Sequence, residues 1–458
     1  MSKMSKTSST PKKLTVLDGW SIGSGGMIGV TVFVVSGSIS AMAGPAACLS
    51  YLIAAAVTIL VAITICEVTA AYPESGGAYI YPKKIIGGRM GDFLSYLSGL
   101  AMYCGQGLLG PATLGLALAN YTIAFVELLG VDFPISNKAF AIIAVLFFGI
   151  SNMISTKIGA AIQVGSTVLV VGPIIIFLVW GGANVDTSLL VPFMPNGISS
   201  VIAGAATAWL GYGAWSAIPN MASEFKNPAK DVPRSMILSL VTCGLLFGGI
   251  VLVMNGLLPY SVLGDLDAPV ADAFATVHVV GGLIIAFGGV FAAVSTLNGL
   301  MMAGSRMTYT MGVQGGLPKI FAKTNKEGVP VVALAVSTAI MVLLSGSATL
   351  TFLVQCNVFV TAFSWLISMI CQIVLRTKHK EIVSPMRCPL FPVIPVVAIV
   401  LSLYMLSKLN VNNLLTGGLI LGFAALLFVI FNFTPAKKLC YQKEVPSLDK
   451  ADIPHEAE

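Results

Sequence analysis

Charge is the first thing this sequence lacks. Only 10% of its 458 residues are Asp, Glu, Lys or Arg, whereas soluble domains carry about 25%. Hydrophobic residues make up 56% of the chain and the mean hydropathy is +0.92. So few charges exclude a soluble enzyme and a nucleic-acid-binding protein, which needs a basic surface against phosphate. The composition predicts an integral membrane protein.

Histidine and paired cysteine are also scarce. The three histidines, His278, His379 and His455, are scattered, and none of the eight cysteines forms a Cys-x-x-Cys pair. A membrane enzyme would need His, Cys or carboxylates clustered at membrane depth, and a metal site would need regularly spaced ligands. We therefore expect no catalytic residue, no metal, no disulfide framework and no cofactor.

Two further features are missing. A channel would show a continuous polar lining or a repeated selectivity element, and neither is visible. The polar N-terminus has no short apolar run followed by a small-residue cleavage site, so we expect no removable signal peptide. The first apolar stretch is expected to stay in the protein.

Long apolar runs dominate what is present. Each is near or above the ~20 residues that a spanning helix needs. Twelve such runs fall at roughly residues 18–42, 46–71, 93–126, 139–154, 158–182, 199–222, 234–258, 277–304, 330–346, 349–375, 390–407 and 413–433. They predict an all-α polytopic membrane protein with twelve transmembrane helices, and tails at 1–17 and 434–458 on the same side.

The basic residues support this count. With the N-terminus in the cytoplasm, 22 of the 25 lysines and arginines fall inside, leaving Lys138 and Lys408 outside and Lys157 at the start of the fifth span. Basic loops stay on the cytoplasmic side of a membrane. We therefore expect a cytoplasmic (plasma) membrane protein with both termini cytoplasmic and its basic tail near anionic lipid.

Glycine is concentrated in two of the predicted spans. The clusters are Gly23, Gly25, Gly26, Gly29 and Gly37 in the first span, and Gly204, Gly211 and Gly213, followed by Pro219, in the sixth. These residues weaken helices, and irregular backbone at membrane depth must be buried in protein or line a cavity. Close helix packing is the alternative explanation.

The two glycine-rich spans occupy corresponding places in two consecutive five-span units, residues 18–182 and 199–375. Paired broken helices in two inverted repeats indicate a transport site near the membrane midplane. The two remaining spans, within residues 390–433, would then be accessory.

Four motifs, in order along the chain, resemble the amino acid, polyamine and organocation superfamily of secondary transporters. They are IGSGGMIGVTVFVVSG followed by AGPA; Glu67 with the run AYPESGGAY at 71–79; SEFKNPAKDVPRSM at 223–236; and SRMTYTMGVQGGLPKIFAKTNKEGVP at 305–330. The resemblance implies a LeuT-type fold, in which a 5+5 inverted-repeat core with helices 1 and 6 broken is joined by two accessory helices. It also implies alternating access and an amino acid or related amine as substrate.

In such a fold the broken first helix offers backbone N–H groups and a helix N-terminus to a substrate carboxylate. The matching positions are Ile28, Gly29, Val30 and Thr31. Thr31 stands where the family usually has a second glycine. Its side chain would either crowd the carboxylate or bind it through the hydroxyl.

The matching stretch of the sixth span is AWLGYGAW at 208–215. Aromatic side chains beside broken backbone can close over a substrate or stack on an amine, and simple core packing is the alternative. The candidates are Trp209, Leu210, Tyr212, Gly213 and Trp215.

Polar residues in other spans are further candidates. Tyr103 and Gln106 lie one turn apart in the third span, and Asn298 lies in the eighth. Each could contact substrate or hydrogen-bond a neighbouring helix. The middles of spans 1, 3, 6, 8 and 10 lack Asp and Glu, which argues against a strongly cationic substrate.

Three charged residues have candidate roles. Lys157 lies in STKIGA, which resembles a Gly-x-Lys element whose lysine takes the place of a sodium ion in some proton-coupled relatives; retention on the cytoplasmic side also explains it. A desolvated lysine can exchange a proton near neutral pH. Glu67 and Arg306, near the cytoplasmic ends of their spans, are candidate gate or structural charges.

These features predict a secondary active transporter for an amino acid or related amine, with proton-coupled symport as the leading hypothesis. An exchanger that needs no ion gradient is the alternative. The expected partners are a small-molecule substrate, protons and membrane lipid.

Overall fold

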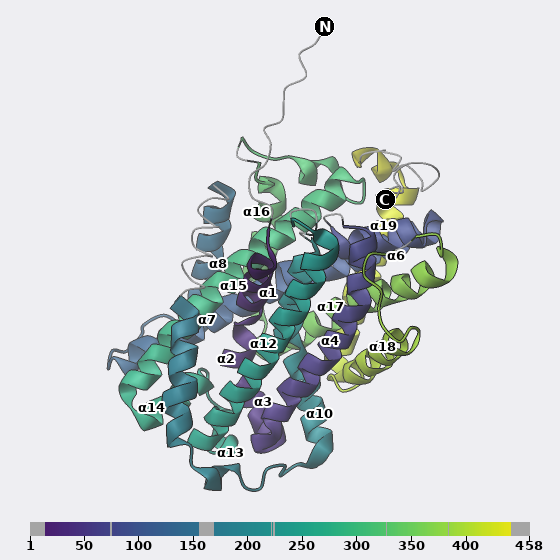
Figure 1. Cartoon of the computed structure of the whole chain (residues 1–458). Coiled ribbons are helices and arrows are strands. Elements are labelled where there is room, and N and C mark those ends of the chain that lie inside the picture. Colours follow the sequence, from purple (N-terminus) through teal and green to yellow (C-terminus); the bar gives the residue numbers. More distant parts are fainter. Residues whose placement is uncertain are drawn as a thin grey trace.

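The computed structural model describes residues 14–73, 76–154, 169–220, 222, 225–326, 328–382 and 384–440. Figure 1 shows an elongated helical bundle. The described residues form no β-strand, only an isolated bridge between Leu14 and Phe225. A helical chain is what a bilayer requires, because helices satisfy their own backbone hydrogen bonds where water is absent.

The helices follow one another with short connections. The first group comprises α1 (Val16–Met27), α2 (Val30–Phe33), α3 (Val35–Ala43), η1 (Gly44–Ala46), α4 (Ala47–Ala71), α5 (Gly77–Ile85), α6 (Gly88–Met102), η2 (Tyr103–Leu109), α7 (Gly110–Leu128) and α8 (Asn137–Ile154). The second comprises η3 (Phe177–Gly181), η4 (Gly182–Asn184), η5 (Thr187–Leu190), α10 (Gly197–Ala208), η6 (Trp209–Ser216), α11 (Ala217–Asn220), α12 (Pro228–Leu257), α13 (Tyr260–Leu263) and α14 (Pro269–Val277). The third comprises α15 (Val279–Val313), η8 (Lys319–Ala322), α16 (Val331–Ser347), α17 (Leu350–Lys378), α18 (Val393–Leu406), α19 (Val411–Phe433) and η9 (Pro435–Leu439).

Seven helical segments of the described chain are long and apolar enough to cross a membrane, or eight if a bent pair at 197–219 is one span. The seven are Val35–Ala71, Gly88–Leu128, Asn137–Ile154, Pro228–Leu257, Val279–Val313, Leu350–Lys378 and Val411–Phe433. Three shorter apolar helices are Leu169–Asn184, Val331–Ser347 and Val393–Leu406. The protein is therefore an integral, polytopic membrane protein, with fewer full-length spans among the described residues than the twelve expected.

One end of the bundle carries most of the described basic residues. Hydrogen bonds join its loops: the Lys226 N–H donates to the Leu14 carbonyl over 3.0 Å, and Asn325 donates to the Met153 carbonyl over 3.1 Å. The His379 ring contacts the Ile85 carbonyl at 2.9 Å. We call this the basic end; its described helix ends and loops carry Lys83, Lys84, Arg89, Lys226, Lys230, Lys319, Lys323, Lys326, Lys378, Lys380 and Arg387.

The opposite end gathers acidic residues. The Ala46 N–H donates to the Phe193 carbonyl over 2.9 Å, and the Asp186 N–H donates to the Gly256 carbonyl over 2.8 Å. We call this the acidic end; its helix ends and loops carry Glu127, Asp132, Asp186, Asp265, Asp267 and Asp272. In Figure 1 it lies at the bottom, where α13 and α14 are labelled.

Two helices are interrupted in the middle of the bundle. The first helical run breaks at Ile28 and Gly29, between α1 and α2, and again at Val34 before α3. The other interrupted helix changes from α10 into the 3₁₀ helix η6, with a bend of about 40° between 197–208 and 211–219. Both fall in the glycine-rich runs, and α1 packs directly against η6. The two breaks therefore meet at the centre of the molecule.

Candidate functional site

A cavity of about 40 Å³ lies where the two broken helices meet. A buried water needs about 10–15 Å³, so the space exceeds that of a single water molecule. The lining comes from the α1–α2 break, η2, α7, α15, η6 and α17: Gly26, Met27, Gly29, Gln106, Gly110, Thr113, Leu114, Gly211, Ala214, Thr296, Leu300 and Asn357. We call it the first cavity.

The lining of the first cavity is polar but uncharged. Gln106, Thr113, Thr296 and Asn357 supply its polar side chains, and none of the described residues that line it is ionisable. Only Gln106 was expected from the sequence. The other three are single polar residues in apolar spans, a signal shared with residues such as Asn255 that bond within or between helices.

The α1–α2 break brings backbone to the cavity. Ile28 ends α1 in an extended conformation, with φ −71° and ψ 95°. Its carbonyl accepts a hydrogen bond from Thr296 Oγ1 over 3.4 Å. A Cβ at Gly29 would lie 3.1 Å from Thr296 Oγ1, so a residue larger than glycine would crowd α15. The N–H groups of the first turn of α2 have no partner within that helix.

The other break exposes small residues to the cavity and turns aromatic ones into the bundle. A 3₁₀ helix has three residues per turn, so residues three apart share a face. Gly211 and Ala214 line the cavity, whereas Trp209, Tyr212 and Trp215 are at most 1% exposed.

These three aromatic side chains contact other helices. Trp209 and Trp215 pack on Trp365 of α17, with ring centroids 5.5 and 5.4 Å apart. Tyr212 donates to the Tyr51 carbonyl over 2.9 Å. None of the three is among the residues that line the first cavity. In this conformation they pack η6 against α17 and α4, on the side facing away from the first cavity.

The remaining polar candidates differ in their surroundings. The Tyr103 hydroxyl lies 2.6 Å from Ser337 Oγ on α16. Asn298 is fully buried and accepts a hydrogen bond from Asn152 Nδ2 over 2.9 Å. It faces α8, while Thr296, two residues earlier on α15, faces the first cavity.

Four predicted site residues lie wholly or partly outside the described residues. Lys157 falls in residues 155–168, outside the described residues. Val30 and Thr31 lie in α2 and Leu210 lies in η6, but their side chains are outside what the structure describes. Gly213 lies in η6, and a Cβ there would be 2.6 Å from Gln106 Nε2.

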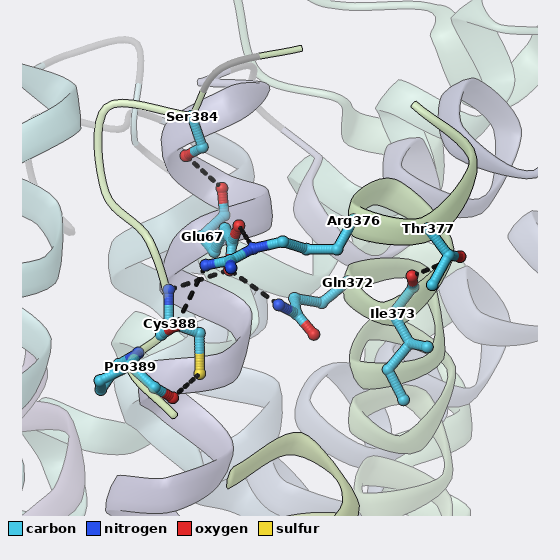
Figure 2. Close-up of polar contacts among 8 residues, drawn as sticks. All are labelled: Glu67, Gln372, Ile373, Arg376, Thr377, Ser384, Cys388 and Pro389. Atoms are coloured by element: carbon cyan, nitrogen blue, oxygen red, sulfur yellow. Dashed lines mark hydrogen bonds and ion pairs between the residues drawn. The ribbon is translucent and has the colours of Figure 1, made fainter. Parts of the chain in front are cut away.

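Glu67 lies in a buried hydrogen-bonded cluster near the basic end, shown in Figure 2. Its carboxylate accepts from Arg376 Nε over 2.5 Å, from Gln372 Nε2 over 2.7 Å and from the Cys388 N–H over 2.9 Å. Ser384 Oγ donates to the Glu67 carbonyl over 2.9 Å. The cluster ties α4, α17 and the segment before α18 together.

The ionic partner of Glu67 is therefore Arg376, to which the sequence had given only a topological role. Glu67 is 2% exposed, and the Arg376 guanidinium also donates to the Cys388 carbonyl over 3.0 Å. Arg306, the other candidate gate charge, lies on α15 with an exposed side chain.

An acidic group lies at the other end of the molecule, outside the spans. Asp272 on α14 is half-buried, and burial raises its pKa to about 6, with the charges of Asp267 and Glu127 adding to the shift. Asn120 of α7 donates to Asp267 Oδ1 over 3.3 Å. This group is a candidate for titration on the acidic side of the bundle.

Comparison with known proteins places the chain in a family. The family model for amino acid permeases matches residues 18–434. The methylthioribose transporter of Bacillus subtilis (strain 168) is 28% identical, over 89% of this chain and 91% of its own length. The branched-chain amino acid permease BcaP of that organism is 25% identical, covering 88% and 89%, and its serine/threonine exchanger SteT is 26% identical, covering 90% and 93%. The chain therefore belongs to the amino acid permease family of membrane transporters.

Proposed function

We propose that this protein is a secondary active transporter that moves an amino acid or a related amine across the cytoplasmic membrane by alternating access. The observation that carries the proposal is the uncharged polar cavity between two broken helices. Paired breaks at one level of a membrane bundle are typical of transport sites. Membership of the family and the names of its relatives support the substrate class.

The finer architecture is part of this proposal. Residues 18–182 and 199–375 form two inverted five-helix repeats of a LeuT-type core, and residues 390–433 form two accessory helices, giving twelve spans. The gathering of basic residues at one end supports a cytoplasmic basic end. It follows that both termini are cytoplasmic and that α13 and α14 face outward.

Substrate recognition combines backbone and amide groups. The N–H groups at Gly29, Val30 and Thr31 bind the carboxylate, because an uncharged lining offers no side-chain cation for it. The Ile28 N–H already donates to the Ser24 carbonyl over 2.9 Å. Gln106 and Asn357 then contact the amino group or a polar side chain. A zwitterion suits this cavity better than a substrate with net charge.

Lys157 couples transport to protons in this proposal. Support comes from its motif, since a lysine desolvated beside the broken helix would lose and regain a proton near neutral pH. Protons are then the driving ion and import is the direction.

Reconstituted uptake tests the proposal. Proteoliposomes are given each of the twenty common amino acids, labelled, with and without an inward proton gradient; methylthioribose is included because one relative carries that name. We expect gradient-driven uptake of at least one amino acid, lost in Lys157→Gln and kept in Lys138→Gln, an exposed lysine at the acidic end. No uptake of any amino acid, into either empty or amino-acid-preloaded vesicles, overturns the function, and uptake that ignores the gradient overturns only the coupling.

Exchange is the second candidate, favoured by the similarity to a serine/threonine exchanger. An exchanger needs substrate on the far side of the membrane. Uptake that requires preloaded amino acid and does not respond to the proton gradient would select this alternative.

A further inference from the structure

A second cavity, of about 30 Å³, lies against the first. Its lining is Met102, Tyr103, Gln106, Gly107, Ala214, Ser216, Ala217, Leu300, Ala303, Gly304 and Met307. Gln106, Ala214 and Leu300 line both cavities, so these three side chains separate the two spaces. Of the three, only Gln106 can form hydrogen bonds through its side chain.

The second cavity lies nearer the basic end. On η6 and the residue that follows it, the lining passes from Gly211 in the first cavity to Ala217 in the second, and the chain continues to the basic loop at Lys226. On α15 it passes from Thr296 to Met307, and the chain continues toward η8. Two segments thus give the same order, with both cavities arranged along the bundle axis.

Gln106 is held against the backbone of η6. It lies in the π-helix η2, whose wide turn is a common feature of functional sites. A Cβ on Gly213 would be 2.6 Å from Gln106 Nε2, so the amide rests directly on the glycine. No residue larger than glycine fits there without moving Gln106.

Glycines also build the far wall of the second cavity. A Cβ on Gly304 would lie 2.6 Å from the Gly107 Cα, so η2 and α15 touch through backbone. Both residues line the second cavity. The close approach leaves this space small and surrounded mainly by apolar and small residues.

We propose that the second cavity is a transient binding site for the transported amino acid on the release side, entered from the first cavity past Gln106. The inference rests on the proposed function. The substrate leaves the backbone groups of the α1–α2 break, passes the amide of Gln106 and is held between η2, α11 and α15 before release. These segments must move apart to admit it, because the cavity of about 30 Å³ has room for only about two water molecules in this conformation. Gln106 serves both spaces, because an amide donates and accepts hydrogen bonds in either direction.

The test uses substitutions of residues that line only the second cavity, because a change at Gln106 would alter both cavities. Ala303→Leu fills the space from α15, and Ala217→Val fills it from α11. Ala335→Leu is the matched control, because Ala335 is exposed on α16. L-serine and L-leucine are the probes, with binding measured by thermal shift of purified protein and uptake measured in proteoliposomes.

We expect both cavity variants to bind the probe as the wild type does and to lower its uptake by about tenfold or more, which corresponds to about 1.4 kcal/mol in the rate-limiting step. The control should match the wild type in both measurements. Uptake at the wild-type rate in both variants, or affinity and uptake falling in parallel, would overturn the second site. Wild-type protein that transports neither these nor any other amino acid would instead overturn the proposed function.

Discussion

Glu67 accepts three hydrogen bonds in a place that water hardly reaches. A buried carboxylate that loses its ionic partner costs on the order of 3 kcal/mol. We therefore expect Arg376→Gln to lower the melting temperature of the detergent-solubilised protein more than the double variant Glu67→Gln/Arg376→Gln does, because the double variant leaves no unpaired charge. A double variant that melts at or below the temperature of the single variant would contradict this account.

Asp272 predicts how stability depends on pH. Its pKa is raised to about 6, chiefly by burial and then by Asp267 and Glu127, whereas an exposed aspartate titrates near about 4. The folded state then binds the proton more tightly than the unfolded state, so stability falls as pH rises from about 4 through about 6.

The matching variant is Asp272→Asn, which has no proton to lose. We expect it to melt at a higher temperature than the wild type at about pH 7.5, with the difference shrinking toward about pH 4.5. Asp132→Asn, an exposed carboxylate in the loop between α7 and α8, is the control and should show no such trend. A difference between Asp272→Asn and the wild type that is the same at both pH values would contradict the assignment.

At the scale of elements, the 3₁₀ geometry of η6 places its aromatic side chains on Trp365. None of the three indole nitrogens of Trp209, Trp215 and Trp365 has a hydrogen-bond partner in the described part of the chain. The cluster is therefore held by ring packing. It fixes the segment whose small residues line the first cavity.

We expect Trp365→Leu to lower stability by about 3 kcal/mol, as large-to-small core changes do, and to weaken substrate binding because η6 loses its support. Thermal melting and substrate-induced thermal shift measure the two effects. Trp180→Leu, at a half-exposed tryptophan near the acidic end, should leave substrate binding unchanged. Unaltered binding in Trp365→Leu would show that η6 needs no support from α17.

The two helix breaks could be predicted from the sequence, because clustered glycines weaken a helix at the place where they occur. The sequence did not predict which way the residues of η6 face, since the change from 3.6 to three residues per turn alters the phase. The sequence therefore offered Trp209, Tyr212 and Trp215 as lining residues, whereas Gly211 and Ala214 take that place in the structure. Thr113, Thr296 and Asn357 were missed because a lone polar residue in an apolar span has the same signature whether it faces a cavity or a neighbouring helix.

At the scale of the whole molecule, the two ends carry charges of opposite sign. We expect Lys323→Cys to react with a membrane-impermeant maleimide only after the cells are opened, and Asp265→Cys to react in intact cells. The described native thiols are buried, apart from the partly buried Cys104, so background labelling should be low. Both sites reacting from the same side would refute the proposed orientation.

The Glu67 cluster sets a limit on how short a working version of this protein can be. The proposed repeats end at residue 375, which invites removal of everything after it. Yet Arg376, Ser384 and the Cys388 backbone all lie beyond that point and hold the backbone or carboxylate of Glu67. A chain that ends at residue 375 would leave the buried Glu67 carboxylate of α4 without its ionic partner. The smallest autonomous unit should extend past Cys388, so the end of α17 and its connection to α18 contribute to the core.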